Sequence, residues 1–196
     1  GPAIAAALRD AGVAPADVGG IGICGQLDGC IAVDAEGAAL APCIIWMDRR
    51  AVAEVADIPA PQVSRTGGLV LDPSHLAAKA RWLKRHLRGA AIARFHQPVS
   101  FVVERLTGAV VIDHALASTS MVYDLDARGY DANLLDRFGL TAAQLPAIAP
   151  AESRAGVLGR AGAALTGLPE GIPVAVGTGD DFATPLGGGL CAPGQV

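Results

Sequence analysis

Two adjacent carboxylates, Asp180 and Asp181, follow an apolar segment that is typical of a buried strand. The strand is predicted over residues 172–176, and a glycine-rich turn at 177–179 joins it to a helical pattern over 182–190. In open α/β sheets, ligands gather at the carboxyl ends of strands, where loop groups and helix N-termini face a crevice. A carboxylate at that place can accept a proton from a reacting hydroxyl group.

A simpler role for these two residues is to cap the helix that follows them, which is a common role for aspartate. Glycines on both sides of Thr178 favour the functional role, because small residues let the backbone approach a phosphate or a sugar closely. A capping role alone would not require them. The pattern therefore favours function and leaves the capping interpretation open.

A second glycine-rich segment, Gly20 to Gly25, matches the GxGxxG spacing of dinucleotide-binding loops, and Asp48 lies downstream where a ribose-binding carboxylate would be. That fingerprint places its glycines between a strand and a helix. Here they are expected within a strand that leads through residues 26–29 into a hairpin, so a dinucleotide site is not predicted. The 4 cysteines show no CxxC spacing, and no metal site is predicted either.

These side chains must be positioned by neighbouring elements, and hydrophobic periodicity predicts strands and helices in an α/β order. Strands are expected at 18–24, 30–33, 38–40, 43–46 and 172–176. Helices are expected at 3–11, 48–57, 74–87, 98–106, 131–138, 161–166 and 182–190. Asp48 is expected to cap the second of these helices, and the proline-rich segment 58–61 is expected to end it.

Composition limits the classes of protein to which the chain can belong. With 52% hydrophobic residues, 17% charged residues and a net charge of -4, it is expected to fold as one globular domain or two. No apolar run is long enough to cross a bilayer, and residues 1–10 lack the features of a secretory signal, so a cytoplasmic location is expected. The chain is not strongly basic, and neither nucleic acid nor membrane is expected as a partner.

Several segments in chain order resemble the FGGY family of carbohydrate kinases, in particular its xylulokinase-like members. The family's stretch ending in GQMHG is similar to VGGIGICGQLDG at 18–29, and its PAILWNDGR is similar to APCIIWMDRRA at 41–51. The helix signature agrees only in part with SHLAAKARWL at 74–83. The family's RLTGE, with the acidic, Ser- and Ala-rich stretch after it, resembles ERLTGAVVIDHALAST at 104–119.

The most specific resemblance is that of PVAVGTGDDFATPLGGGLCAPGQV at 173–196 to the family's PVVAGGGDQAAAALGAGVVEPGQ. It implies that Asp180 is the catalytic base and that Asp181 contacts the sugar. It further implies sugar contacts by Leu27 and Asp28, which stand where the xylulokinases carry Met-His. This departure predicts a different sugar selectivity, unless Asp28 only closes the tight turn before Gly29.

Gln26 and Trp46 are expected to support the packing of the loop that carries Leu27 and Asp28. The resemblance gives them no direct part in the reaction.

The resemblance implies an actin-like ATPase fold, related to ribonuclease H, in which two domains close on sugar and ATP. Residues 1–196 would be most of the N-terminal, sugar-binding domain. The family's DxGT segment is expected before Gly1 and its ATP-binding domain after Val196. ATP and Mg²⁺ are then bound mainly by parts outside this chain, and no cofactor or metal ligand is expected within it.

The expected function is that of an ATP-dependent kinase that phosphorylates a hydroxyl of a ketose or polyol. These 196 residues by themselves are expected to be an incomplete, inactive fragment of such an enzyme. The partner is a small-molecule sugar, and the resemblance leaves a homodimer open. The alternative is a non-catalytic sugar-binding or interaction module derived from such a kinase.

Overall fold

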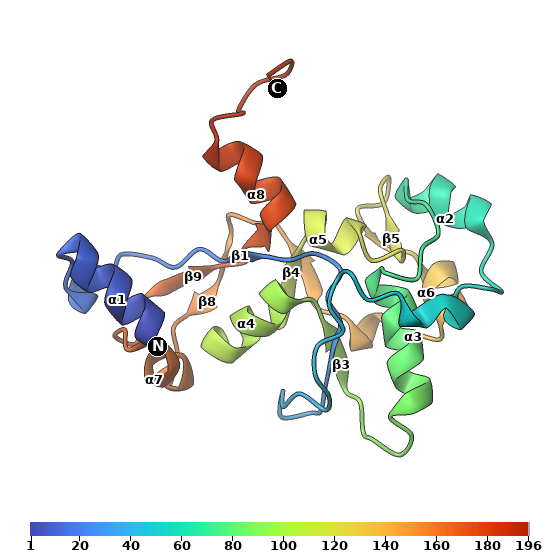
Figure 1. Ribbon diagram of the computed structural model, residues 1–196, viewed down its shortest axis with the longest axis horizontal. Helices are drawn as coiled ribbons and strands as arrows, with labels where there is room; N and C mark the ends of the chain where they lie inside the picture. Colours follow the sequence, from blue (N-terminus) through green and yellow to red (C-terminus); the bar gives the residue numbers. More distant parts are fainter. Residues whose placement is uncertain (196) are drawn as a thin grey trace.

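Short strands and helices alternate along an elongated molecule in the computed structural model, which describes residues 1–195 (Figure 1). The helices are α1 (Pro2–Ala11), α2 (Ala60–Gly67), α3 (Leu76–His86), α4 (Pro98–Thr107), α5 (His114–Ser118), α6 (Ala132–Phe138), α7 (Arg160–Thr166) and α8 (Asp180–Gly187), with 3-10 helices η1 (Pro15–Asp17), η2 (Arg50–Glu54) and η3 (Ala142–Gln144). The strands are β1 (Cys24–Gly25), β2 (Ile31–Val33), β3 (Arg94–His96), β4 (Val111–Asp113), β5 (Tyr123–Asp124), β6 (Gly129–Tyr130), β7 (Ala147–Ala149), β8 (Arg154–Val157), β9 (Pro173–Ala175) and β10 (Thr178–Gly179).

Within residues 1–195 the strands associate in five pairs, two of which are parallel. β1 pairs with β10, with Cys24 opposite Thr178 and Gly25 opposite Gly179, and β4 pairs with β7. A parallel bridge between Ile21 and Val174 continues the first pairing back towards β9. The antiparallel pairs are β2 with β3, β5 with β6, and β8 with β9. The two chain segments that carry the predicted site residues therefore run side by side in the same direction.

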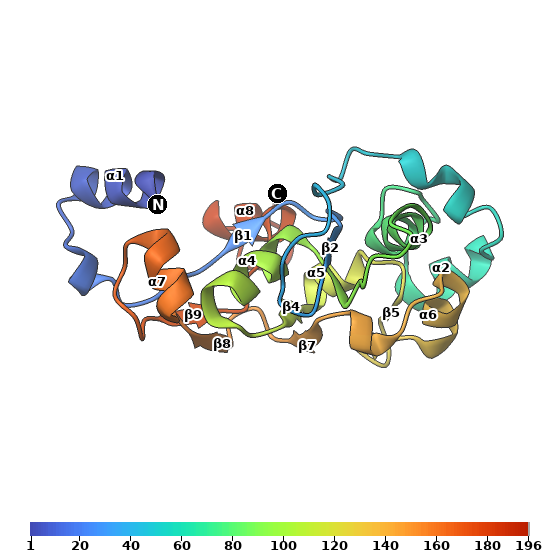
Figure 2. The same cartoon turned by 90° about the horizontal axis from the view of Figure 1, so that it is seen from below.

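Buried apolar side chains form three clusters within residues 1–195. The elements that carry them follow one another along the length of the molecule (Figure 2). At one end, α3 and α6 pack on the pair β2 and β3. In the middle, α4 packs on α5 and β4, and at the other end the last turn of α4 meets β9 and α7. α4 thus connects two of the clusters, and it lies beside the β1–β10 pair.

Five of the predicted helices are confirmed to within about two residues. They are α1, α3, α4, α6 and α7. Each of these helices except α3 ends on a glycine with positive φ, Gly12, Gly108, Gly139 or Gly167, which is the residue type that tolerates this backbone conformation best. The helix predicted at 182–190 is confirmed in place but not in its bounds, because α8 begins at Asp180 and ends at Gly187.

The expected helix at 48–57 is wrong. Only a 3-10 helix forms there, and Asp48 does not cap a regular helix, because its carboxylate accepts from the backbone amide of Arg50 and pairs with the Arg50 guanidinium. The prolines that were expected to end this helix instead begin α2, which the sequence did not predict. Pro59 is its N-cap and Pro61 lies in its first turn, where a missing backbone N–H costs nothing.

The strands predicted at 30–33 and 172–176 are placed correctly but are shorter. The strand predicted at 18–24 is displaced, because β1 begins only at Cys24 and a single bridge at Ile21 precedes it. Residues 38–40 and 43–46 each make a single antiparallel bridge, Ala39 with Val33 and Ile44 with Cys30. The main partner of β2 is β3, at residues 94–96, which the sequence did not predict. β4, β7, β8 and α5 were not predicted either. None of the helices formed by residues 1–195 is both long and apolar enough to cross a membrane.

Candidate active site

A cavity of about 290 Å³ contains all four predicted site residues. It is lined by Gln26, Leu27, Asp28, Trp46, Ser74, Asp180 and Asp181. The chain therefore brings together side chains that are more than 150 positions apart in sequence. Ser74, just before α3, was not predicted as a site residue.

The parallel pairing of β1 with β10 explains this convergence. Because the two strands run side by side in the same direction, the segments that follow them leave the pair at the same edge. The turn that carries Leu27 and Asp28 follows β1, and α8, which carries Asp180 and Asp181, follows β10. The site lies at the carboxyl ends of two neighbouring strands, as the sequence pattern predicts.

Two glycines between β9 and α8 are required because protein atoms approach them closely. The turn expected at 177–179 is wrong in part, since Thr178 and Gly179 form β10 and pair with β1. At Gly177, with φ of 78°, an added Cβ would lie 2.3 Å from the backbone oxygen of Ile23. At Gly179 it would lie 2.6 Å from Cδ2 of Leu27. The glycines thus allow β1 and β10 to pack together, so a close approach by a ligand is not needed to explain them.

Asp180 and Asp181 form the first turn of α8, and the N-cap is Gly179, without a side-chain cap. The side-chain capping role considered for the two aspartates is therefore not observed. One oxygen of Asp180, Oδ1, accepts a hydrogen bond of 3.2 Å from the amide of Asp181, and both residues are exposed. Two carboxylates at a helix N-terminus are stabilised by the helix dipole.

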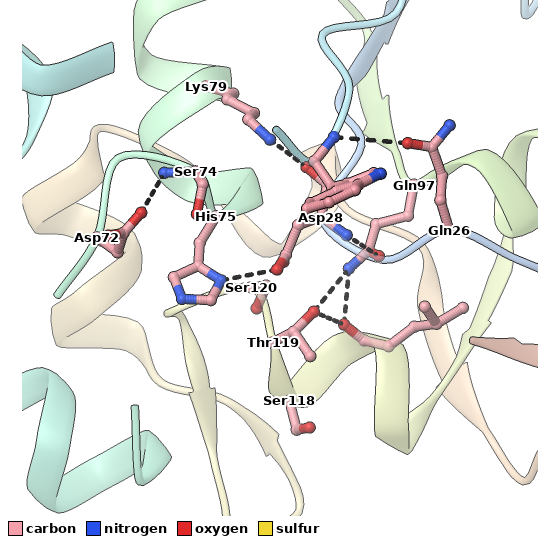
Figure 3. A network of polar contacts seen from close by, with 12 residues as sticks. Gln26, Asp28, Asp72, Ser74, His75, Lys79, Gln97, Ser118, Thr119 and Ser120 are labelled. Atoms are coloured by element: carbon pink, nitrogen blue, oxygen red, sulfur yellow. Dashed lines mark hydrogen bonds and ion pairs between the residues drawn. The ribbon is translucent and has the colours of Figure 1, made fainter. Parts of the chain in front are cut away.

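Asp28 adopts a left-handed backbone conformation, with φ of 56°, and is held there from both sides (Figure 3). Its amide donates to Oε1 of Gln97 at 2.9 Å, and its backbone oxygen accepts from Nζ of Lys79 at 2.7 Å. Its side-chain Oδ2 lies 2.9 Å from Nδ1 of His75. Aspartate tolerates positive φ better than most residues, but the three contacts go beyond what a simple turn needs.

Lys79 is fully buried, and its ammonium also donates to the backbone oxygen of Ile45 at 2.9 Å. Burial lowers the pKa of Lys79, and the nearby Asp28 carboxylate opposes this shift. Lys79 therefore joins the turn after β1 to the segment that carries Trp46. The sequence resemblance included Lys79, but it gave no reason for the buried charge.

Gln97 is the second buried support of the Asp28 turn. Its side chain is fully buried, and its Nε2 donates to the backbone oxygen of Leu116 at 2.6 Å. The one signal for Gln97 in the sequence is its place directly before the helix predicted at 98–106. His75 carried no such signal, because its partner Asp28 lies 47 positions away.

The prediction that Gln26 and Trp46 only support the loop is incomplete. The amide of Trp46 does approach Oε1 of Gln26, at 3.5 Å. Both residues nevertheless line the cavity, and the Trp46 residue is 55% exposed. Trp46 therefore offers a free apolar surface at the edge of the cavity.

The cavity is acidic, which limits what it can hold. Its lining side chains include three carboxylates and, within residues 1–195, no cation. In that same part of the chain, no group of three or more His, Cys, Asp or Glu side chains is arranged to hold a metal ion. The acidic lining does not suit a triphosphate, and the described residues do not gather their carboxylates around a common metal position.

Comparison with known proteins agrees with the resemblance seen in the sequence. The FGGY family of carbohydrate kinases, N-terminal domain, matches residues 2–187. Glycerol kinases of Agrobacterium fabrum and Myxococcus xanthus are 30% and 32% identical over 97% and 98% of this chain. The chain spans 40% of the length of each of these two relatives.

Solved structures of sugar kinases superpose closely on the chain. A xylulose kinase of Rhodospirillum rubrum has a TM-score of 0.84 at 31% identity, covering 90% of this chain and 37% of its own. A structure described as a xyloylose kinase of Brucella ovis has a TM-score of 0.82 at 33% identity, covering 92% and 38%. The expected actin-like ATPase fold is thereby confirmed. Val196, the last residue of the motif at 173–196, lies outside the described residues. The chain belongs to the FGGY family of carbohydrate kinases and matches its N-terminal domain.

Proposed function

We propose that the protein is an ATP-dependent kinase that phosphorylates a hydroxyl of a ketose or polyol. The observation that carries the proposal is the single cavity in which Asp28, Asp180 and Asp181 converge at the carboxyl ends of β1 and β10. In this reaction the sugar oxygen forms a bond to the γ-phosphorus of ATP, and the bond from that phosphorus to the β,γ-bridging oxygen breaks. ADP leaves, and the hydroxyl proton passes to a carboxylate.

Asp180 is the proposed proton acceptor. The amide of Asp181 engages Oδ1 of Asp180, and Oδ2 has no hydrogen-bond partner within residues 1–195. That oxygen is available to a hydroxyl in the cavity. General-base catalysis of this kind typically contributes about 10²–10⁴-fold to the rate.

The charge of the cavity supports an uncharged substrate rich in hydroxyl groups. Carboxylates only accept hydrogen bonds, so Asp28 and Asp181 suit hydroxyl donors and repel an anionic sugar. The nearest buried cation, Lys79, already donates to two backbone oxygens and does not line the cavity. We assign Leu27 and the exposed ring of Trp46 to the apolar C–H face of the sugar.

ATP and Mg²⁺ are proposed to be bound mainly outside this chain. The support is chemical, because the acidic cavity does not suit a triphosphate. The chain also spans 40% of the length of the glycerol kinases it matches. When bound, Mg²⁺ would supply charge stabilisation to the transferring phosphoryl group.

The natural full-length protein tests the proposal, assayed with ATP against a panel of pentuloses, hexuloses and polyols. Asp180→Asn is expected to lower kcat by about 10²–10⁴-fold with a small change in sugar KM, because the amide keeps the shape and cannot take the proton. Asp181→Asn is the matched comparison. A larger loss of kcat in Asp181→Asn, with both variants folded, would reverse the assignment of the base.

The same panel of sugars distinguishes a kinase from a non-catalytic sugar-binding or interaction module. A wild-type protein that binds a sugar but transfers no phosphoryl group to any member of the panel would favour a non-catalytic sugar-binding module.

A further inference from the structure

The carboxylate of Asp28 has one side-chain partner within residues 1–195, the imidazole of His75. Its Oδ2 lies 2.9 Å from Nδ1 of His75, and the two side chains are 14% and 17% exposed. The other contacts of Asp28, with Gln97 and Lys79, are made by its backbone. These backbone contacts fix the turn, but the orientation of the carboxylate is set by its contact with His75.

The second carboxylate oxygen, Oδ1, is buried and has no hydrogen-bond partner in the described part of the chain. Asp28 nevertheless lines the cavity that holds Asp180 and Asp181. A buried acceptor without a donor is costly, and a substrate hydroxyl that displaced the atoms covering Oδ1 on entering the cavity would remove that cost. The carboxylate is thus held at one oxygen and unsatisfied at the other.

We propose that His75 is a positioning residue for substrate recognition. Its Nδ1–H holds Oδ2 of Asp28 and so directs the free oxygen of that carboxylate to a substrate hydroxyl. This inference rests on the proposed function, because it assumes that the cavity takes a hydroxyl-rich sugar.

The chemistry of the pair fixes where the proton of His75 must be. A carboxylate accepts and does not donate, so Nδ1 carries a hydrogen whether the imidazole is neutral or charged. The neutral ring is therefore the Nδ1–H tautomer, with Nε2 unprotonated.

His75 lies at the N-cap of α3 and makes no side-chain cap bond there. Capping thus does not explain the imidazole. Removal of its donor should weaken sugar binding through Asp28 rather than destabilise the helix.

The first test uses two substitutions of His75 in the natural full-length protein. His75→Phe keeps a flat ring without a donor, and it is expected to raise KM for D-xylulose or glycerol by about 10-fold or more while kcat changes little. His75→Asn places an amide N–H near the position of Nδ1, and it should restore KM to within about 3-fold of wild type. His86→Phe, on the exposed side of α3, is the matched control.

A double-substitution cycle shows whether His75 acts through Asp28. In an Asp28→Ala background, the further change His75→Phe should leave KM unaltered, because the group that His75 positions is gone. Equal effects of His75→Phe with and without Asp28 would overturn the proposal. So would an equally high KM for His75→Asn and His75→Phe, since the imidazole would then act by its shape.

A measurement on the unsubstituted protein does not depend on the folding of any variant. Long-range ¹H–¹⁵N correlation spectra of histidine-labelled protein distinguish the two neutral tautomers, and His75 should give the Nδ1–H pattern. An Nε2–H pattern for His75 would overturn the proposal. A wild-type protein without kinase activity would instead contradict the proposed function, while direct titration with glycerol or D-xylulose would still compare His75→Phe with His75→Asn.

Discussion

The hydroxyl of Thr178 donates a hydrogen bond of 2.8 Å to Oδ2 of Asp113. The same buried carboxylate is the N-cap of α5 and accepts from the amides of Ala115 and Leu116. Asp113 therefore joins the strand that leads to Asp180 to the beginning of α5. Through this contact the candidate base is anchored to the central apolar cluster.

Thr178→Val should destabilise the protein by about 1–2 kcal/mol, because it removes a donor to a buried carboxylate and keeps the shape of the side chain. Thr178→Ser retains the hydroxyl and should cost less. Urea unfolding of both variants measures the difference in the free energy of unfolding. Equal losses would mean that the hydroxyl adds nothing to the stability of this region.

Gly177→Ala should destabilise the protein more than Gly167→Ala. Both glycines have positive φ, 78° and 80°, so both substitutions carry the backbone cost of about 1–2 kcal/mol. Only at Gly177 would the new methyl group meet a backbone oxygen, that of Ile23, at 2.3 Å. The surroundings of Gly167 are open within 4 Å.

The clash at Gly177 should add about 1–3 kcal/mol to the backbone cost. Thermal or urea unfolding of the two variants provides the comparison. If Gly167→Ala were the more destabilising of the two, the close packing of β1 on β10 would not be what requires Gly177.

Asp28→Ala should change the order in which the full-length protein prefers its sugars. Sugars that place a hydroxyl donor against this carboxylate should lose about 10- to 100-fold in kcat/KM, and sugars without such a hydroxyl should lose less. A panel of pentuloses, hexuloses and polyols measures the order before and after the substitution. An equal loss for every sugar, or no loss, would reduce Asp28 to a turn residue.

Acid should destabilise the protein partly through His96. Burial of the imidazole lowers the pKa of His96 to about 4, although the Glu104 carboxylate 2.8 Å away opposes the shift and Arg94 pairs with the same carboxylate. Between about pH 6.5 and 4 the unfolded chain binds a proton at this histidine that the folded protein does not. The free energy of unfolding therefore falls as the pH drops through that window.

His96→Gln should make this fall shallower by on the order of 1 kcal/mol. Urea unfolding at pH 7 and pH 4.5 measures it, with His86→Gln as the control because His86 is exposed. An unchanged pH dependence in His96→Gln would assign acid sensitivity to the carboxylates alone.

The sequence alone determined those helices and strands whose signals lie within a few neighbouring residues. Apolar spacing was sufficient to predict helices such as α1, α3 and α4, because a helix buries a face that repeats within a few residues. The position of Asp180 between an apolar strand and a helix also followed from the sequence, as did the family. Motif order along the chain carries that information without any contact having to be known.

The same reasoning failed where two local signals competed. Asp48 and the prolines at 59 and 61 predict the start and the stop of one helix. In the folded chain the Asp48 carboxylate pairs with the Arg50 guanidinium, and the prolines lie at the beginning of α2 instead. A proline is compatible with the first turn of a helix as well as with its end, so its position alone could not decide between them.

Only the tertiary structure decided how the site is assembled. The pairing of β1 with β10 places Asp28 beside Asp180, and the support of Asp28 by His75, Lys79 and Gln97 spans 47 to 69 positions of sequence. Each of these contacts depends on how distant elements pack, and apolar periodicity reports only which face of an element is buried. Strand pairing and helix packing together decide which polar side chains come into contact. The polar atoms that are buried in this way must find hydrogen-bond partners nearby.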